Sequence, residues 1–223
     1  MPAQARGTLV ALEGGEGSGK STQAARLAGW LRAGGHEVCL TAEPGGTPLG
    51  ELVKRVFQRP LEHRLNARAE LLLFEAARAD HVERVIRPAL AAGRIVLCDR
   101  FTDSSIAYQG HGRGLPVEEV RRCSEVATGG LSPDFTLLFD VPPETGLGRA
   151  DAGDDRAPDY IGRESLEFHR RVREGFLELA KAGGEQRYAV IDASAPEQQV
   201  YDNALQAVTR LLERVPTPRQ ERP

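Results

Sequence analysis

Five short apolar runs recur along the chain and are separated by longer stretches with a helical period. Continuous apolar runs of this length, containing β-branched residues, are typical of strands that are buried on both faces of a sheet. The predicted strands are Thr8–Leu12, Val38–Thr41, Ile95–Cys98, Phe135–Val141 and Tyr188–Ile191. The predicted helices are Ser21–Ala33, Gly50–Gln58, Ala67–Ala92, Pro116–Thr128, Pro143–Ala150, Glu164–Ala182 and Pro196–Arg214, with Pro88 expected to kink or interrupt the third.

Strands that alternate with helices predict an α/β fold with a parallel sheet covered on both faces. Right-handed crossovers would bring the carboxyl ends of the strands to one edge. The glycine-rich stretch after the first run, together with Glu43, Asp99 and Asp140, follows such ends, so we expect these groups to meet where open α/β sheets bind ligands.

Two segments are irregular, and together they suggest the domain organisation. Residues 150–162 are too broken by Gly, Pro and Asp to continue a helix, and residues 216–223 form a polar, proline-containing tail. We therefore expect a flexible start over residues 1–7, one domain over residues 8–215 with an insertion near residues 150–163, and a flexible end.

Composition narrows the class of protein. The chain has 223 residues and a formal net charge of −3, which gives no basic footprint for nucleic-acid binding. No apolar run reaches the length of a membrane span, and the first residues lack the apolar core of a signal peptide. The three cysteines, Cys39, Cys98 and Cys123, are widely spaced and two lie inside apolar runs, which favours buried thiols and a cytoplasmic location.

The glycine-rich stretch carries the clearest chemistry. It matches the phosphate-loop pattern G-x-x-x-x-G-K-[ST] directly after a strand, and it reads Gly14, Gly15, Glu16, Gly17, Ser18, Gly19, Lys20, Ser21 and Thr22. Its backbone amides and the helix that begins near Ser18 would hold the phosphates of ATP. Lys20 would reach the β- and γ-phosphates, and the Ser21 hydroxyl would ligate Mg²⁺.

A second group of residues can hold an acceptor. Asp99 at a strand end can hold Mg²⁺, directly or through water, and the neighbouring Arg100 can clamp a second phosphate. Phe74 and Arg78 are four residues apart and share a helix face, where an aromatic plane and a forked donor could receive a nucleobase. The segment Ser104–Gly114 is rich in polar donors and glycine, which predicts a pocket wall and a poor core element.

These motifs, in this order, resemble those of the bacterial thymidylate kinase family over about residues 8–213. The shared motifs are Glu13–Thr22, Glu43–Thr47, Leu73–Arg78, Asp99-Arg100, Ala107–Gly114 and Pro133–Val141. The resemblance implies transfer of a phosphoryl group from ATP to dTMP with Mg²⁺, a P-loop α/β/α fold with a five-stranded parallel sheet, and a homodimer.

The resemblance also assigns roles. It places dTMP against Glu16, Glu43, Phe74, Arg78, Arg100, Ser105, Tyr108 and Gln109, with Phe74 stacked on thymine, Arg78 and Gln109 reading its polar edge, Tyr108 against the sugar and Glu16 on the 3′-hydroxyl. It assigns catalysis to Lys20, Arg100, Arg149, Arg156 and Glu16, places Arg149 also at ATP, and makes Glu43 a possible metal ligand beside Ser21 and Asp99. The loop Asp192–Ser194 is the expected adenine pocket from its fold position.

The chain departs from the motifs of this family in two places, and two alternative functions stay open. Many relatives have Arg where this chain has Ala42, so the acceptor phosphate would depend more on Arg100, and a longer insertion leaves either Arg156 or Arg163 as the catalytic arginine. Another nucleoside-monophosphate kinase is one alternative function. A phosphate-loop ATPase that switches partner binding is the other, although the chain has no Asn-Lys-x-Asp guanine motif and such a switch leaves the second anion-binding set unexplained.

Overall fold

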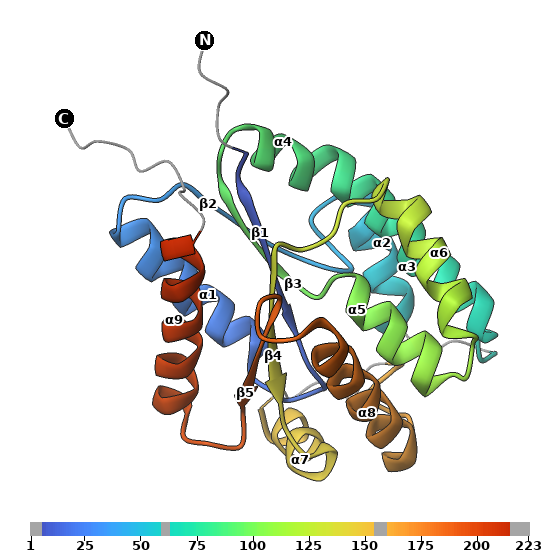
Figure 1. Ribbon diagram of the computed structural model, residues 1–223. Coiled ribbons are helices and arrows are strands. Elements are labelled where there is room, and N and C mark those ends of the chain that lie inside the picture. The colour runs from blue at the N-terminus through green and yellow to red at the C-terminus, as the bar shows by residue number, and fades with distance from the viewer. Residues whose placement is uncertain (1–5, 59–62, 154–159, 215–223) are drawn as a thin grey trace.

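A parallel five-stranded sheet forms the centre of the molecule in the computed structural model, which describes residues 6–58, 63–153 and 160–214 (Figure 1). The strands are β1 (Thr8–Glu13), β2 (Val38–Ala42), β3 (Ile95–Asp99), β4 (Phe135–Asp140) and β5 (Tyr188–Asp192), in the spatial order β2-β3-β1-β4-β5. All five predicted strands are confirmed, and their ends differ from the prediction by one residue. The register aligns Asp99 with both Leu12 and Ala42, so the ends of three strands adjoin.

Helices cover both faces of this sheet, as the alternation predicts. The helices α1 (Lys20–Ala33) and α9 (Glu197–Arg214) pack on one face, where Val10 and Leu12 point. Leu9 and Ala11 point to the opposite face and pack against residues of a long helical run and of β3. That second face carries α3 (Ala67–His81), the π-helical segment η1 (Val82–Ile86), α4 (Arg87–Ala91), α5 (Thr102–Ser105), the π-helical segment η2 (Ile106–Gly112), α6 (Val117–Thr128) and α8 (Leu166–Gly183), with α2 (Pro48–Gln58) against α3 and α7 (Pro143–Gly153) against α8 (Figure 1).

Three local predictions need correction or refinement. The irregularity expected at Pro88 is the π-helical segment η1 just before it, since a widened turn accommodates a residue without an amide hydrogen. The segment Ser104–Gly114 is helical over most of its length, and Ala107 and Tyr108 are buried in an apolar cluster, so the prediction of a poor core element was wrong. The helix predicted to end at Ala150 continues to Gly153, while residues 154–159 of the predicted insertion lie outside the described part of the chain.

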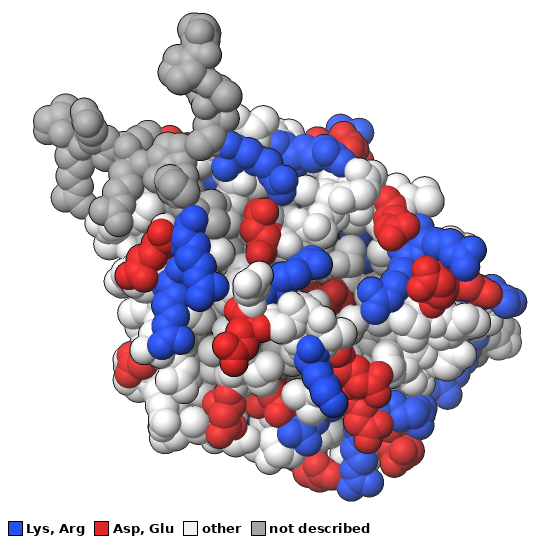
Figure 2. Space-filling model, viewed as in Figure 1, with Lys and Arg blue, Asp and Glu red and all other residues white. Residues whose placement is uncertain are grey.

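Charged side chains of one sign do not gather into a patch on the face of the molecule that Figure 2 shows. Figure 2 shows acidic and basic side chains interspersed over that face, in keeping with the small net charge of the chain. None of the helices in the described ranges is long and apolar enough to cross a membrane.

Candidate active site

The loop between β1 and α1 is shaped to bind an anion. Gly19 precedes α1 with φ +80°, a left-handed conformation that favours glycine, and no side chain of the described residues caps the helix there. A Cβ on Gly17 would lie 1.8 Å from the carbonyl oxygen of Gly146 in α7, so only glycine fits this close approach. The first amides of α1 are therefore open to the anionic oxygens of a phosphate.

Lys20 is buried at the start of this helix and turns back over the loop. Its Nζ donates to the carbonyl oxygen of Gly15 at 2.8 Å and to Ser18 Oγ at 3.2 Å. Burial, together with the nearby Arg100, lowers the pKa of Lys20 to about 8. A bound polyphosphate would supply the negative charge that this desolvated ammonium lacks.

Ser21 and Asp99 meet at the end of the loop. The Ser21 hydroxyl donates to Asp99 Oδ2 at 2.5 Å, which joins the loop to the carboxyl end of β3. Hydroxyl and carboxylate oxygens are hard ligands of the kind that Mg²⁺ prefers. This donor set fits a magnesium ion bound beside the phosphates. Asp140, at the end of β4, instead forms an ion pair with Arg173 of α8 (Nε to Oδ1 2.7 Å).

Arg100 lies between the phosphate loop and the neighbouring pocket. Its backbone has φ +70°, which is uncommon for a residue other than glycine and is characteristic of functional sites. Its guanidinium donates to the carbonyl oxygen of Gly14 at 3.1 Å, to Ser104 Oγ at 3.3 Å and to Glu16 Oε1 at 2.7 Å. Glu16 therefore points toward Arg100.

Glu13 supports this arrangement and was missed as a site residue. It is buried at the end of β1, and its carboxyl group accepts from the amides of Phe101 (2.8 Å) and Ser104 (3.2 Å) and bonds Ser104 Oγ at 2.6 Å. Burial, reinforced by Asp103, raises the pKa of Glu13 to about 8. Through these three hydrogen bonds the buried carboxyl group positions the loop that carries Arg100. An acidic residue closing an otherwise apolar strand was the signal that could have revealed it.

A cavity of about 270 Å³ opens next to this loop. All eight residues that the resemblance assigns to dTMP line it, as do Ser21 and Asp99. The wall also contains Ser104, from the segment that was predicted to be a pocket wall, and residues that carried no predicted role: Pro44, Lys54, Phe57, Gln58 and Ile161. Lys54 brings a cation from α2 to the same wall as Ala42.

One face of Phe74 is already covered. Its ring stacks on Phe57 with centroids 4.4 Å apart and planes 5° apart, and Tyr160 packs against Phe57 in turn (5.7 Å). No base can enter between two rings at this spacing. A base stacked on Phe74 must therefore use its other face.

Arg78 is buried and held by four acceptors. Its Nε donates to Glu43 (2.7 Å), its Nη1 to Glu75 (2.6 Å) and Ser105 (2.8 Å), and its Nη2 to the carbonyl oxygen of Phe101 (2.9 Å). A guanidinium has five N–H groups, so these four bonds to described residues leave one N–H that they do not use. The fork is therefore fixed before any ligand binds.

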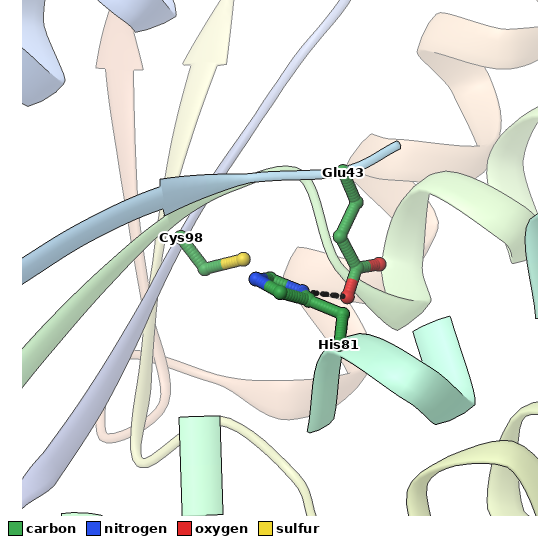
Figure 3. Close-up of side chains that lie close together, drawn as sticks. All are labelled: Glu43, His81 and Cys98. Atoms are coloured by element: carbon green, nitrogen blue, oxygen red, sulfur yellow. Dashed lines mark hydrogen bonds and ion pairs between the residues drawn. The ribbon is translucent and has the colours of Figure 1, made fainter. Parts of the chain in front are cut away.

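Glu43 is the anchor of this fork. One of its oxygens accepts a hydrogen bond from Arg78 Nε. The other lies 2.9 Å from His81 Nδ1 (Figure 3). The second ring nitrogen, His81 Nε2, lies 2.6 Å from Thr41 Oγ1. Cys98 completes a buried trio with Glu43 and His81, and its thiol donates to the carbonyl oxygen of Arg100 at 3.1 Å. Each Glu43 oxygen accepts one hydrogen bond and keeps a further lone pair, and Glu43 lines the pocket together with Ser21 and Asp99, so its role as a possible metal ligand stays a prediction.

The π-helical segment η2 brings Tyr108 and Gln109 into the pocket wall. The Tyr108 hydroxyl donates to Glu16 Oε1 at 2.9 Å, and the Arg100 guanidinium lies 5.0 Å from its ring centre. Burial raises the pKa of Tyr108 well above its ordinary value, so this hydroxyl keeps its proton.

The candidate lid arginines are only partly described. Arg149, at α7, donates to the carbonyl oxygens of Ala193 (2.6 Å) and Ser194 (3.2 Å), in the loop after β5 where the adenine pocket is expected. It therefore lies at that loop and not at the acceptor pocket. Arg156 lies outside the described residues.

Comparisons with known proteins agree with this geometry. The family model described as "Thymidylate kinase" matches residues 12–204. The thymidylate kinase of Pseudomonas fluorescens is 49% identical over 208 residues, which cover 93% of this chain and 98% of that protein. The thymidylate kinase of Deinococcus radiodurans is 49% identical over 195 residues, covering 87% and 93%.

A solved structure shares the fold. The crystal structure of thymidylate kinase from Ehrlichia chaffeensis matches with a TM-score of 0.72 and 34% identity, over 91% of this chain and 99% of that one. A family model over most of the chain, and relatives near half identity along almost their full length, together decide the assignment. The chain belongs to the thymidylate kinase family.

Proposed function

We propose that the pocket beside the phosphate loop is the acceptor site for the reaction of this family, in which dTMP and ATP give dTDP and ADP. The observation that carries this proposal is the position of Arg100, which bonds the loop through Gly14 and Glu16 and also lines the pocket. Two anionic nucleotides bound on either side of one guanidinium would have their phosphates end to end.

The pocket supplies side chains for each part of dTMP. Thymine would stack on the open face of Phe74, with Arg78 and Gln109 at its polar edge. The sugar would lie against Tyr108, with its 3′-hydroxyl at Glu16, and the phosphate would lie between Arg100 and Lys54. Because the Tyr108 ring is held by its bond to Glu16, a ribose 2′-hydroxyl would meet a fixed surface.

The phosphate loop would hold ATP on the other side. The amides at the start of α1 and Lys20 would bind its β- and γ-phosphates, and the adenine would lie near Arg149 and the loop after β5. Ser21 and Asp99 would hold Mg²⁺, which neutralises charge on the transferred phosphoryl group when it is bound. An oxygen of the dTMP phosphate attacks the γ-phosphorus of ATP, and the bond to the bridging oxygen of ADP breaks.

The chain's own cations stabilise this transfer. Negative charge spreads over the oxygens of the transferred group, and preorganised donors that are already desolvated stabilise it strongly. Arg100 and Lys20 are held in place by their bonds to the loop, so little reorganisation is needed. In our proposal Arg149 orients ATP through its contact with the 193–194 loop and does not touch the γ-phosphate.

The test is a panel of monophosphate acceptors assayed by ADP release with MgATP. We expect dTMP to be the best acceptor, dUMP to be slower by about 10- to 100-fold because it lacks one methyl group, and CMP and GMP to be poor. Leaving out Mg²⁺ should abolish transfer. ADP release that does not depend on any acceptor would instead favour an ATPase switch.

Phe74 should matter for dTMP and not for ATP. Replacing Phe74 by Ala removes the stacking surface, and base stacking contributes ~1–3 kcal/mol, so we expect the KM for dTMP to rise about 10- to 100-fold. The KM for ATP should change less than twofold. Leu65→Ala is a matched control, since this partly buried residue packs in the same apolar cluster but does not line the pocket. A larger change for ATP than for dTMP would place the base elsewhere.

We also propose that a lid arginine completes the site, with Arg156 as the first candidate and Arg163 as the second. An arginine that closes on the transferred phosphoryl group contributes ~10³-fold or more to kcat. We therefore expect Arg156→Ala to lower kcat strongly and to leave both KM values near those of the wild type. The same loss in Arg163→Ala, with Arg156→Ala nearly active, would move the role to Arg163.

We propose finally that two copies of the chain form a homodimer through α2, α3 and α6. The helix α3 packs against both others, and these three helices expose Leu49 and Leu52, Leu72, and Val126 (Figure 1). Leu72→Glu should shift the chain from dimer to monomer in light scattering. Val190→Glu on the edge strand β5 is the control and should leave the mass unchanged, whereas a monomeric wild-type chain would contradict the proposal.

A further inference from the structure

A buried carboxylate holds the amide of Gln109. Glu70 on α3 is fully buried, and its Oε1 accepts a hydrogen bond from Gln109 Nε2 at 2.9 Å. Arg113 binds the same carboxylate with two nitrogens, Nε at 3.0 Å from Oε1 and Nη2 at 2.8 Å from Oε2. A carboxylate paired in this way accepts hydrogen bonds and donates none, so only the NH₂ end of the Gln109 amide can face it.

The other end of the amide is thereby directed away from Glu70. Gln109 lines the acceptor pocket, and within the described ranges no hydrogen bond reaches its Oε1. The pocket thus contains a hydrogen-bond acceptor whose orientation does not depend on the ligand. Arg113 is itself held from the other side by Glu164 (Nη1 to Oε1 2.7 Å), so its guanidinium is fixed between two carboxylates.

The chemistry of the pyrimidines makes this orientation selective. Thymine and uracil carry one ring donor on their polar edge, the N3–H, whereas cytosine has a lone pair at N3. We propose that Glu70 is a specificity-determining positioning residue, which holds the Gln109 amide oxygen toward the base N3–H and so selects thymine and uracil against cytosine. This inference rests on the proposed function, because it requires the base to lie in this pocket.

Cytosine cannot be accommodated by a simple rotation of the amide. If Gln109 turned its NH₂ group toward the cytosine N3, its oxygen would face the Glu70 carboxylate, and two acceptors would oppose each other in a buried site. If Gln109 did not turn, its amide oxygen would face the lone pair on cytosine N3, and two acceptors would oppose each other at the base. A site with a fixed polar group rejects a mismatched ligand strongly, by roughly 10²-fold or more.

The experiment replaces Glu70 by Gln and compares kcat/KM for dTMP, dUMP and dCMP. A glutamine at position 70 can either donate or accept, so Gln109 becomes free to turn. We expect the preference for dTMP over dCMP to fall at least about 10-fold. The preference for dTMP over dUMP should stay unchanged, because both bases carry N3–H.

Glu164→Gln is the matched control. It removes a carboxylate from the same Arg113 but does not touch Gln109, so the preference for dTMP over dCMP should stay at the wild-type value. If Glu70→Gln does not fold, the double variant with Arg113→Met carries the same test, since replacing both members of a buried ion pair is better tolerated than removing one.

The outcomes separate two failures. A folded Glu70→Gln variant with the wild-type preference for dTMP over dCMP would overturn the role of Glu70, even if Gln109→Ala raises the KM for dTMP. If Phe74→Ala and Gln109→Ala both leave that KM unchanged, the base binds elsewhere, and the proposed function of this pocket falls together with the inference.

Discussion

Replacing Lys20 by Met should lower kcat by about 10³-fold or more while the protein stays folded. Lys20 is the cation that the phosphate loop places at the β- and γ-phosphates in our proposal, and removing a preorganised donor of this kind costs ~10²- to 10³-fold even when the donor is neutral. Methionine keeps most of the side-chain volume. Steady-state ADP release with dTMP measures the loss.

The stability of this variant is part of the prediction. Burial lowers the pKa of Lys20 to about 8 in the folded chain from its ordinary value of 10.5, so the charged form is less favourable in the folded state than in the unfolded one. Removing the charge should therefore not lower the melting temperature at pH 7. Turnover within a few-fold of the wild type would remove Lys20 from the mechanism, and a variant that unfolds would show that its role is structural.

Replacing Arg100 by Ala should lower kcat/KM for dTMP by about 10³-fold, the second large effect. This guanidinium bridges Gly14, Glu16 and Ser104 at the edge of the pocket. Among the described residues that line the pocket, Lys54 is the cation beside Arg100 that is free to bind the acceptor phosphate, because Arg78 is engaged by four acceptors.

Arg100→Lys should restore little of this activity. A lysine is a point charge and cannot bridge three acceptors with a planar fork. Arg94→Ala is the control, since Arg94 lies next to the other end of β3 in an exposed ion pair with Glu37, and exposed pairs contribute ~1 kcal/mol or less. Full activity of Arg100→Lys would mean that charge alone suffices, and an unchanged kcat/KM in Arg100→Ala would place the acceptor phosphate elsewhere.

The sequence predicted the sheet better than the segments around it. Buried parallel strands such as Ile95–Asp99 are recognisable because continuous apolar runs occur where both faces of the chain are covered. The segment Ser104–Gly114 was misjudged because its glycines and polar residues have low helix propensity, yet α8 packs against it and buries Ala107 and Tyr108. Tertiary packing there overrides local preference.

The residues of the candidate site also differ in whether the sequence predicts them. Gly14 to Thr22, Asp99 and Arg100 could be found from the sequence because their chemistry requires particular residue types at fixed spacings. Glu13, Glu70 and Phe57 could not be found in this way. Each of them acts through a partner that is distant in sequence: Glu13 on the Arg100 loop, Glu70 on Gln109 and Phe57 on Phe74. The local spacing of residues along the chain does not predict such pairs.

By itself the amino-acid sequence determined the order of strands and helices, the phosphate loop and the family to which the chain belongs, since these depend on hydrophobic period and on contiguous motifs. Only the tertiary structure decided how each side chain is used: that Glu43 anchors Arg78, that one face of Phe74 is covered, and that the Gln109 amide has one orientation. The reason is that hydrogen bonding and stacking depend on distances of a few ångströms between residues tens of positions apart, which only the folded chain sets.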